Sequence, residues 1–206
     1  MPTGTSQETI SAGGVSISSS ISKNASGCFG QETTLNAANA GDLTTRTDNT
    51  TGVLTMDDAN HGITNAAIFD LHWQNSSVPQ CAYGCVADSV SGNSIGFSVT
   101  GGDVLPAANT AINAQLVTTL DVDVDGDLLE IVAVGANIDA HITFRDAGDN
   151  VLMGRTIPAN SAWKWVKNSG DNNELAGNAI AYAEVSCGNA TNGATVKIGG
   201  VYNSIS

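Results

Sequence analysis

The densest group of side chains that could do chemistry is the segment LDVDVDGDLLE, residues 120–130. Asp121, Asp123 and Asp125, followed by a glycine, match the first, third, fifth and sixth positions of an EF-hand calcium loop. That loop also needs a bidentate glutamate at its twelfth position, where this chain has Val132. We therefore expect the three aspartates to hold a divalent ion only weakly, and we predict no metal site of high affinity and no cofactor.

A β-hairpin fits the same segment better. Leu120, Val122 and Val124 alternate with the aspartates, which places the apolar side chains on one face of a strand. Asp125-Gly126 is a favourable turn, and Leu128–Val134 would return as the partner strand. The sequence therefore predicts a hairpin whose aspartates face outward.

Other residues with catalytic potential are scattered along the chain. No serine lies in a G-x-S-x-G motif, and no cysteine neighbours a histidine in sequence. Asp57-Asp58 followed by His61 would form either an acid–base or metal-binding group or, more simply, a loop cap. No catalytic residue is assigned, and we expect a protein that is not an enzyme.

The four cysteines do not form a zinc-binding pattern. Cys81 and Cys85 are three residues apart, with no second Cys or His pair at finger spacing. In a reducing cytosol they would be small buried thiols. A Cys81–Cys85 disulfide across a tight loop is the alternative after release into an oxidising medium.

Charge excludes several classes of partner. The chain has seven Lys and Arg against twenty Asp and Glu, a net charge of −13. Nucleic-acid binding depends on cations that neutralise phosphates, and an anionic membrane would repel this chain. The first residues, MPTGTSQETISAGG, lack the basic and apolar regions of a secretory signal, and no run of about 18 apolar residues is present. We expect synthesis in the cytoplasm without a signal peptide, no nucleic-acid partner and no membrane partner.

Short alternating runs indicate an all-β protein with little helix. Apolar residues return with period two in runs of four to eight, and no window places them at helical spacing over three turns. Loops rich in Gly, Asn and Asp separate the runs and supply the positive φ that tight turns need. Clear examples are Phe69, Leu71 and Trp73 in one run, Ile95–Val99, Val151–Ile157 and Ala194–Val201.

These runs predict a small β-barrel followed by a β-sandwich. We expect an extended N-terminal arm over 1–13, a β domain over 14–117 and a β-sandwich over 118–206. The barrel would occupy about 50–117, either as part of the first domain or inserted between strands of the second. In the arm, Ile10 is the one apolar side chain of any size after Met1, and it is a candidate contact with a neighbouring subunit.

The second domain holds the other interaction candidates. Trp163 and Trp165 lie on one face of an expected strand, where two indoles would either stack on sugar rings or seed the core. Arg145 and Arg155 belong to the one basic grouping, which would either pair internally with aspartates or face an acidic neighbour.

Several short motifs resemble a small β-barrel module that recurs in structural proteins of tailed bacteriophages. In that module an HGI turn precedes a strand, and a V-x-G-N turn joins two later strands. This chain has His61-Gly62-Ile63 and Val90-Ser91-Gly92-Asn93, with a strand ending at Trp73, but Asn65-Ala66-Ala67 stands where the module has a glycine-acid turn. The segments 157–163 and 194–202 are similar to the β-sandwich part of related virion proteins.

The resemblance implies a non-enzymatic virion component. It points first to a capsid decoration (cement) protein that binds the major capsid protein or other virion subunits, as a homo-oligomer. A tail or fibre component is the alternative, and a carbohydrate- or host-receptor-binding module is a further one.

Overall fold

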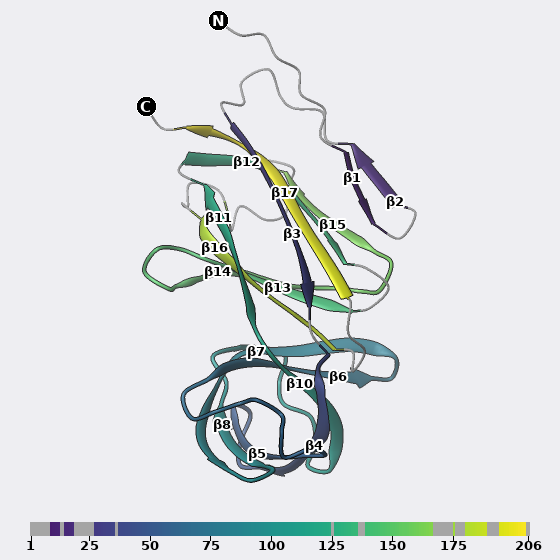
Figure 1. Ribbon diagram of the computed structural model, residues 1–206, viewed down its shortest axis with the longest axis vertical. Coiled ribbons are helices and arrows are strands. Elements are labelled where there is room, and N and C mark those ends of the chain that lie inside the picture. Colours follow the sequence, from purple (N-terminus) through teal and green to yellow (C-terminus); the bar gives the residue numbers. More distant parts are fainter. Residues whose placement is uncertain are drawn as a thin grey trace, which may run out of the picture.

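The computed structural model describes residues 9–12, 15–18, 27–35, 37–124, 126–135, 139–166, 175, 180–188 and 194–204. All regular secondary structure in these ranges is β, which confirms the all-β prediction, and the strands form a closed barrel and a sandwich stacked on it (Figure 1). No helix in these ranges is long and apolar enough to cross a membrane.

Six strands close the barrel in the order β6–β10–β4–β5–β8–β7, with β7 pairing back onto β6. Every pairing is antiparallel, and the short β9 adds to β7. Alternate residues point inward, so large side chains such as Leu54, Phe69 and Phe97 fill the interior. The strands are β4 (Asn39–Arg46), β5 (Thr51–Met56), β6 (Ile68–Asn75), β7 (Val78–Ser91), β8 (Ser94–Ser98), β9 (Gly101–Gly102) and β10 (Thr110–Leu116).

The sandwich consists of two four-stranded sheets, ordered β11–β16–β13–β14 and β15–β12–β17–β3. Its core contains Phe144, Ile142 and Val185 from the first sheet and Ile198 from the second. The strands are β3 (Gly27–Leu35), β11 (Thr118–Val124), β12 (Gly126–Gly135), β13 (Ala140–Arg145), β14 (Val151–Ile157), β15 (Ala162–Val166), β16 (Ile180–Cys187) and β17 (Ala194–Ser204).

The chain enters the sandwich before it builds the barrel. β3 pairs with β17 near the far end of the sequence, so the barrel strands from Asn39 to Leu116 lie between two sandwich strands, β3 and β11. The barrel therefore starts before residue 50. Its first strand, β4, has few large apolar residues, with Leu43 as its main core side chain, and its sequence gives only a weak alternating signal.

The predicted hairpin at 120–134 is wrong. Both strands exist, but β11 pairs with β16 in one sheet and β12 pairs with β15 and β17 in the other. β11 therefore ends at Val124 in one sheet and β12 begins at Gly126 in the other. Leu120 does point into the sandwich core, whereas Asp125 and the side chains of Asp121 and Asp123 lie outside the described residues.

Part of the expected N-terminal arm forms a strand. β1 (Thr9–Ala12) pairs with β2 (Val15–Ser18) in a separate two-stranded sheet, and Ile10 lies opposite Ile17. Residues 1–8 and 13 of the predicted arm lie outside the described residues.

Candidate functional site

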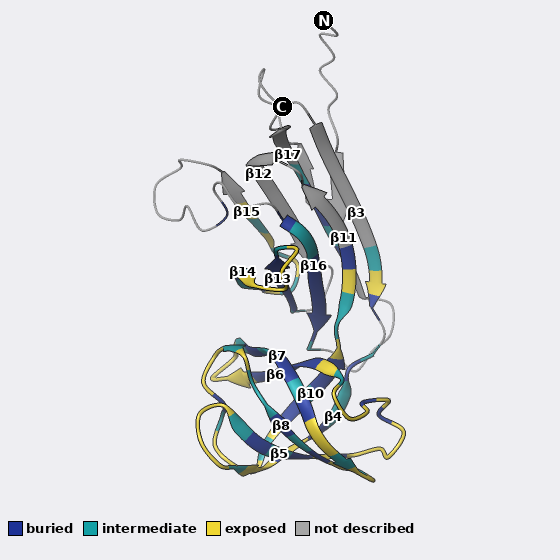
Figure 2. Cartoon of the chain, turned by 90° about the vertical axis from the view of Figure 1, so that its left-hand side faces the viewer, coloured by how far each residue is buried: buried dark blue, intermediate teal, exposed yellow. Residues whose placement is uncertain are grey.

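The two faces of β6 are both buried, although its alternation predicts one exposed face. Phe69, Leu71 and Trp73 point into the barrel, as the sequence indicates. Asp70 and His72 point to the outside of the barrel, yet they are only 1% and 4% exposed. The reason is that the sandwich covers this side of the barrel (Figure 2).

The covering surface is the outer face of the sheet that contains β13 and β16. The inward residues of both strands belong to the sandwich core. The alternate residues are polar, face the barrel and are also buried; they are His141, Thr143 and Arg145 on β13 and Glu184 and Ser186 on β16. Barrel and sandwich thus enclose a polar layer, which we call the junction.

At the centre of the junction, one serine hydroxyl joins an aspartate to a histidine. Ser186 Oγ donates to Asp70 Oδ2 at 2.5 Å, and Nε2 of His72 lies 2.9 Å from Ser186 Oγ. Because the serine proton goes to Asp70, His72 donates its Nε2–H to Ser186, and its Nδ1 keeps a lone pair. A catalytic triad has the histidine in the middle and an accessible hydroxyl, whereas here the hydroxyl is in the middle and fully buried.

The ionisation of these groups agrees with that assignment. Burial raises the pKa of Asp70 to about 6, although hydrogen bonds from Ser186 and the Gly84 N–H oppose the rise. Burial lowers the pKa of His72 to about 4. At neutral pH the carboxylate is therefore ionised and the imidazole is neutral.

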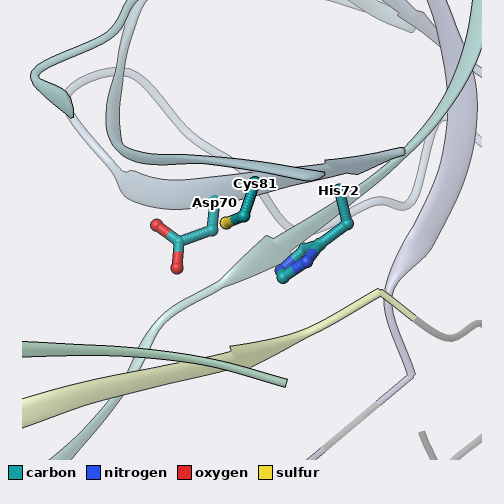
Figure 3. Close-up of side chains that lie close together, drawn as sticks. All are labelled: Asp70, His72 and Cys81. Carbon is teal, nitrogen blue, oxygen red and sulfur yellow. The ribbon is translucent and has the colours of Figure 1, made fainter. Parts of the chain in front are cut away.

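Asp70, His72 and Cys81 are the described residues that could hold a metal ion. Their ligand atoms lie within 4.8 Å of one another (Figure 3), and Cys81 is the cross-strand partner of His72. Binding would require the Ser186 hydroxyl to leave its position between Asp70 and His72. It would also require the Cys81 thiol to lose its proton, and burial raises the pKa of that thiol well above its ordinary value. The geometry therefore favours the hydrogen-bonded arrangement.

The two neighbouring cysteines do not form a disulfide. Both Cys81 and Cys85 are free and buried. Cys85 belongs to the barrel core, whereas Cys81 lies beside Asp70 and His72 at the junction. Gly84, with a φ of 62°, lies between them on β7. The two thiols therefore lie in different environments, the Cys85 thiol in the barrel core and the Cys81 thiol at the junction.

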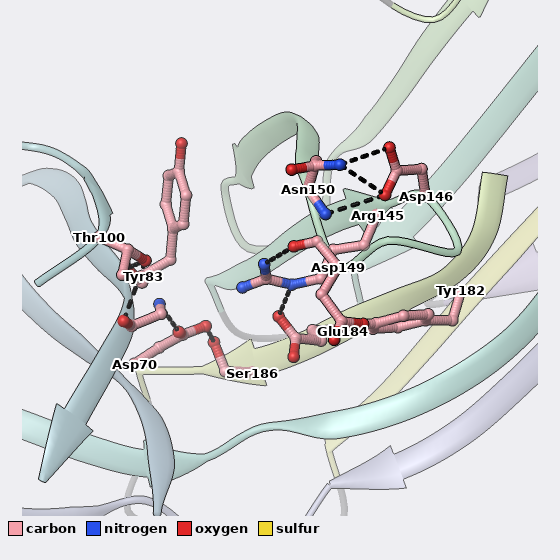
Figure 4. A network of polar contacts seen from close by, with 11 residues as sticks. Asp70, Tyr83, Thr100, Arg145, Asp146, Asp149, Asn150, Tyr182, Glu184 and Ser186 are labelled. Atoms are coloured by element: carbon pink, nitrogen blue, oxygen red, sulfur yellow. Dashed lines mark hydrogen bonds and ion pairs between the residues drawn. The ribbon is translucent and has the colours of Figure 1, made fainter. Parts of the chain in front are cut away.

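A buried ion pair completes the junction. Arg145 Nε donates to Glu184 Oε2 at 2.6 Å, and Arg145 Nη1 donates to the carbonyl oxygen of Asp149 (Figure 4). Arg145 therefore pairs internally, one of the two alternatives that the sequence left open, but its ionic partner is Glu184 and not an aspartate. Arg155 is half-buried and donates to the Gly154 carbonyl.

Five further contacts and close approaches join the sandwich to the barrel, three of them at the end of β16. Gln115 Oε1 accepts from the Cys187 N–H at 2.5 Å, and Asn113 donates to the Gly188 carbonyl at 2.8 Å. Gln74 donates to Asp139 at 2.8 Å. Two glycines allow close approach: a Cβ on Gly188 would lie 2.9 Å from the Cβ of His72, and one on Gly154 would lie 2.8 Å from the Tyr83 ring.

The remaining sequence candidates lie away from the junction centre. Trp163 is half-buried and packs on the sandwich core, with its ring centroid 6.1 Å from that of Phe144. The side chain of Trp165 lies outside the described residues. Asp58 caps a loop by accepting from the Asn60 N–H, as the simpler alternative proposed.

The sequence did not indicate Asp70 or Ser186 as functional residues. Asp70 and Ser186 are 116 residues apart in the chain, and neither lies in a recognisable sequence motif. Comparison with protein-family models, with curated proteins and with solved structures finds no match for this chain.

Proposed function

We propose that this protein is a non-enzymatic structural component of a tailed-bacteriophage particle, most simply a decoration protein that binds and stabilises the head shell. Its partners would be the major capsid protein or other virion subunits and further copies of itself. A tail or fibre component is the alternative.

The junction is the observation that carries the proposal. Asp70, His72 and Ser186 have the side chains of a hydrolytic site, but each is at most 4% exposed and they are hydrogen-bonded to one another. Their arrangement holds two β units in one orientation. A fixed orientation of barrel and sandwich suits a subunit that bridges neighbours on a shell. Each unit can contact a different neighbour, and no entropy is lost in ordering the two units relative to each other.

The two turn motifs that carry the resemblance contact each other in the structure, and this contact supports the resemblance to the phage barrel module. His61 Nδ1 accepts from the Ile63 N–H, and its Nε2 donates to the Gly92 carbonyl at 3.1 Å. The HGI turn is thus bonded to the V-x-G-N turn. At the position of the expected glycine-acid turn, Ala66 adopts a φ of 63°, a backbone conformation that glycine prefers.

The test is to purify particles from a host lysate and to look for the protein in them by mass spectrometry. Where it is present, it is stripped from the particles and purified protein is added back. We expect saturable rebinding to heads at a fixed ratio to the shell protein, weakened by salt because the chain is strongly acidic. Absence from particles would refute the proposal, and rebinding to tails alone would favour the alternative.

A further inference from the structure

The junction is the plane along which the molecule can open without exposing a core. The buried apolar side chains form two separate clusters, one inside the barrel and one inside the sandwich. The faces that meet at the junction carry polar side chains, such as His72 on the barrel and His141 and Glu184 on the sandwich. Separation of the two units would hydrate these groups, and domains that meet through polar interfaces move relative to each other unless other contacts prevent it.

The chain is arranged as a hinge along one edge of the junction. It passes from the sandwich into the barrel between β3 and β4, and it returns between β10 and β11. Asn39 at the start of β4 is paired with Ala114 near the end of β10, so the two crossings lie side by side. The contacts at the centre of the junction are hydrogen bonds and ring stacking.

His141 is a junction side chain that accommodates a positive charge poorly. It is 3% exposed, and its ring stacks on Tyr83 of the barrel, with the centroids 4.9 Å apart and the planes 18° apart. Its Nδ1 lies 3.0 Å from Thr156 Oγ1, whereas its Nε2 is buried and has no hydrogen-bond partner in the described part of the chain. Because the two rings are nearly parallel, an Nε2–H would point past the Tyr83 ring and not at its face.

The ionisation of His141 follows from this environment. Burial, with smaller contributions from His72 and Arg155, lowers the pKa of His141 from 6.5 to about 3. Opening would return the imidazole to water, so its contribution to the closed junction is complete above pH 6.5 and is lost as the pH falls toward 3. His72 acts in the same direction, whereas Asp70, whose pKa burial raises to about 6, acts in the opposite one.

The other titratable or charged groups at the junction do not offset a charge on His141. They are Cys81 and Tyr83 on the barrel and Asp139, Arg145, Arg155 and Glu184 on the sandwich. Burial raises the pKa of both Cys81 and Tyr83, so these two stay neutral in acid. Arg145 and Glu184 pair with each other, and Asp139 accepts from Gln74 and the Ala159 N–H.

We propose that acid opens the molecule at the junction: protonation of His141 separates the barrel from the sandwich about the two chain crossings, and each unit keeps its own core. At neutral pH the hydrogen bonds of Ser186 with Asp70 and His72 hold the junction closed. The inference rests on the junction alone and does not depend on a role in a particle.

The cysteines report the opening directly. Cys81 lies at the junction, Cys85 in the barrel core and Cys187 in the sandwich core, and all three are free and buried. The full-length protein is treated with 4,4′-dithiodipyridine from about pH 7 to about pH 4, the range over which an exposed histidine titrates. Peptide mass spectrometry measures the modification of each cysteine. Each rate is divided by the rate of the same cysteine in urea-unfolded protein at the same pH, which removes the pH dependence of the thiol itself. We expect the normalised Cys81 rate to rise as the pH falls, while those of Cys85 and Cys187 stay low.

Two variants test the trigger. His141→Asn removes the titrating group and keeps a nitrogen donor near the Nδ1 position, beside Thr156. Its normalised Cys81 rate should rise less steeply than that of the wild type, by up to about tenfold per pH unit, the effect of one proton. Thr143→Val is the matched control, because Thr143 is the next residue on the same buried face of β13 and does not titrate. Its rate should change with pH as steeply as that of the wild type.

Three outcomes would overturn the inference. A Cys81 rate as low in acid as at neutral pH shows that the junction stays closed. Cys81, Cys85 and Cys187 that become reactive together show that acid unfolds the whole protein. A pH dependence of His141→Asn at least as steep as that of the wild type shows that another group is the trigger. Low Cys85 and Cys187 rates at neutral pH verify that each variant is folded, and the wild-type rates alone decide whether the junction opens.

Discussion

Ser186 of the sandwich donates a hydrogen bond to Asp70 of the barrel at 2.5 Å, across 116 residues of chain. Both residues lie on strand faces that would be exposed if either unit stood alone, and both are at most 1% exposed here. The barrel and the sandwich therefore stabilise each other through a buried polar contact, and the two units should unfold together.

Removal of the bridging hydroxyl should weaken this coupling. Ser186→Ala leaves the Asp70 carboxylate and the His72 Nε2–H without their common partner, and an unsatisfied buried polar group costs about 1–3 kcal/mol. We expect the free energy of unfolding, from urea denaturation, to fall by about that amount. Ser94→Ala changes an exposed strand serine and serves as the control. Equal stability of Ser186→Ala and Ser94→Ala would show that the bridge contributes nothing.

A methyl group at Gly188 should push the two units apart. The added Cβ would lie 2.9 Å from the Cβ of His72, a distance at which one backbone must move. Overpacking of this kind costs about 1–3 kcal/mol, so Gly188→Ala should lower the midpoint of thermal unfolding. At Gly148 the nearest atom is the flexible Asn150 side chain, and Gly148→Ala should have little effect. A wild-type midpoint for Gly188→Ala would contradict the close approach.

Acid should destabilise the Asp70→Asn variant more strongly than the wild-type protein. Burial lowers the pKa of His72 to about 4 and of His141 to about 3, from an ordinary 6.5. Their contribution to stability is therefore complete above pH 6.5 and is lost as the pH falls toward these values. Asp70 acts in the opposite direction, because its folded pKa of about 6 lies above the ordinary 3.8. Its buried charge costs stability above pH 6, and this cost disappears as the pH falls from 6 to 4.

The two effects partly cancel in the wild type between pH 6 and pH 4. In Asp70→Asn only the histidine effect remains, so the free energy of unfolding should fall more steeply over this interval. Urea denaturation at several pH values measures the slope, with the exposed Asp88→Asn as the charge-matched control. A slope for Asp70→Asn equal to that of the control would contradict the raised pKa of Asp70.

The sequence predicted the elements better than their partners. Alternation placed Phe69, Leu71 and Trp73 inside the barrel correctly, because each residue's face depends only on its neighbours in the strand. The same alternation made Asp70 and His72 look exposed, because nothing in a strand's own pattern reveals that a distant sheet covers its outer face. The hairpin at 120–134 failed for a related reason: a favourable turn is a local signal, whereas strand pairing is decided by the whole sheet.

Calcium should not bind tightly to the acidic segment. With β11 and β12 in different sheets and no glutamate at the twelfth position, no EF-hand can form. Calorimetry should show no binding tighter than about 100 µM. A one-to-one isotherm in the micromolar range that is lost in Asp123→Ala would contradict this prediction.

The most direct test of the structural role is a cryo-electron microscopy reconstruction of particles purified with the protein attached. We expect density for a six-stranded barrel stacked on a β-sandwich at symmetry-related positions on the outside of the head shell. Particles that contain the protein but show such density only on the tail, or at no defined position, would contradict the decoration role.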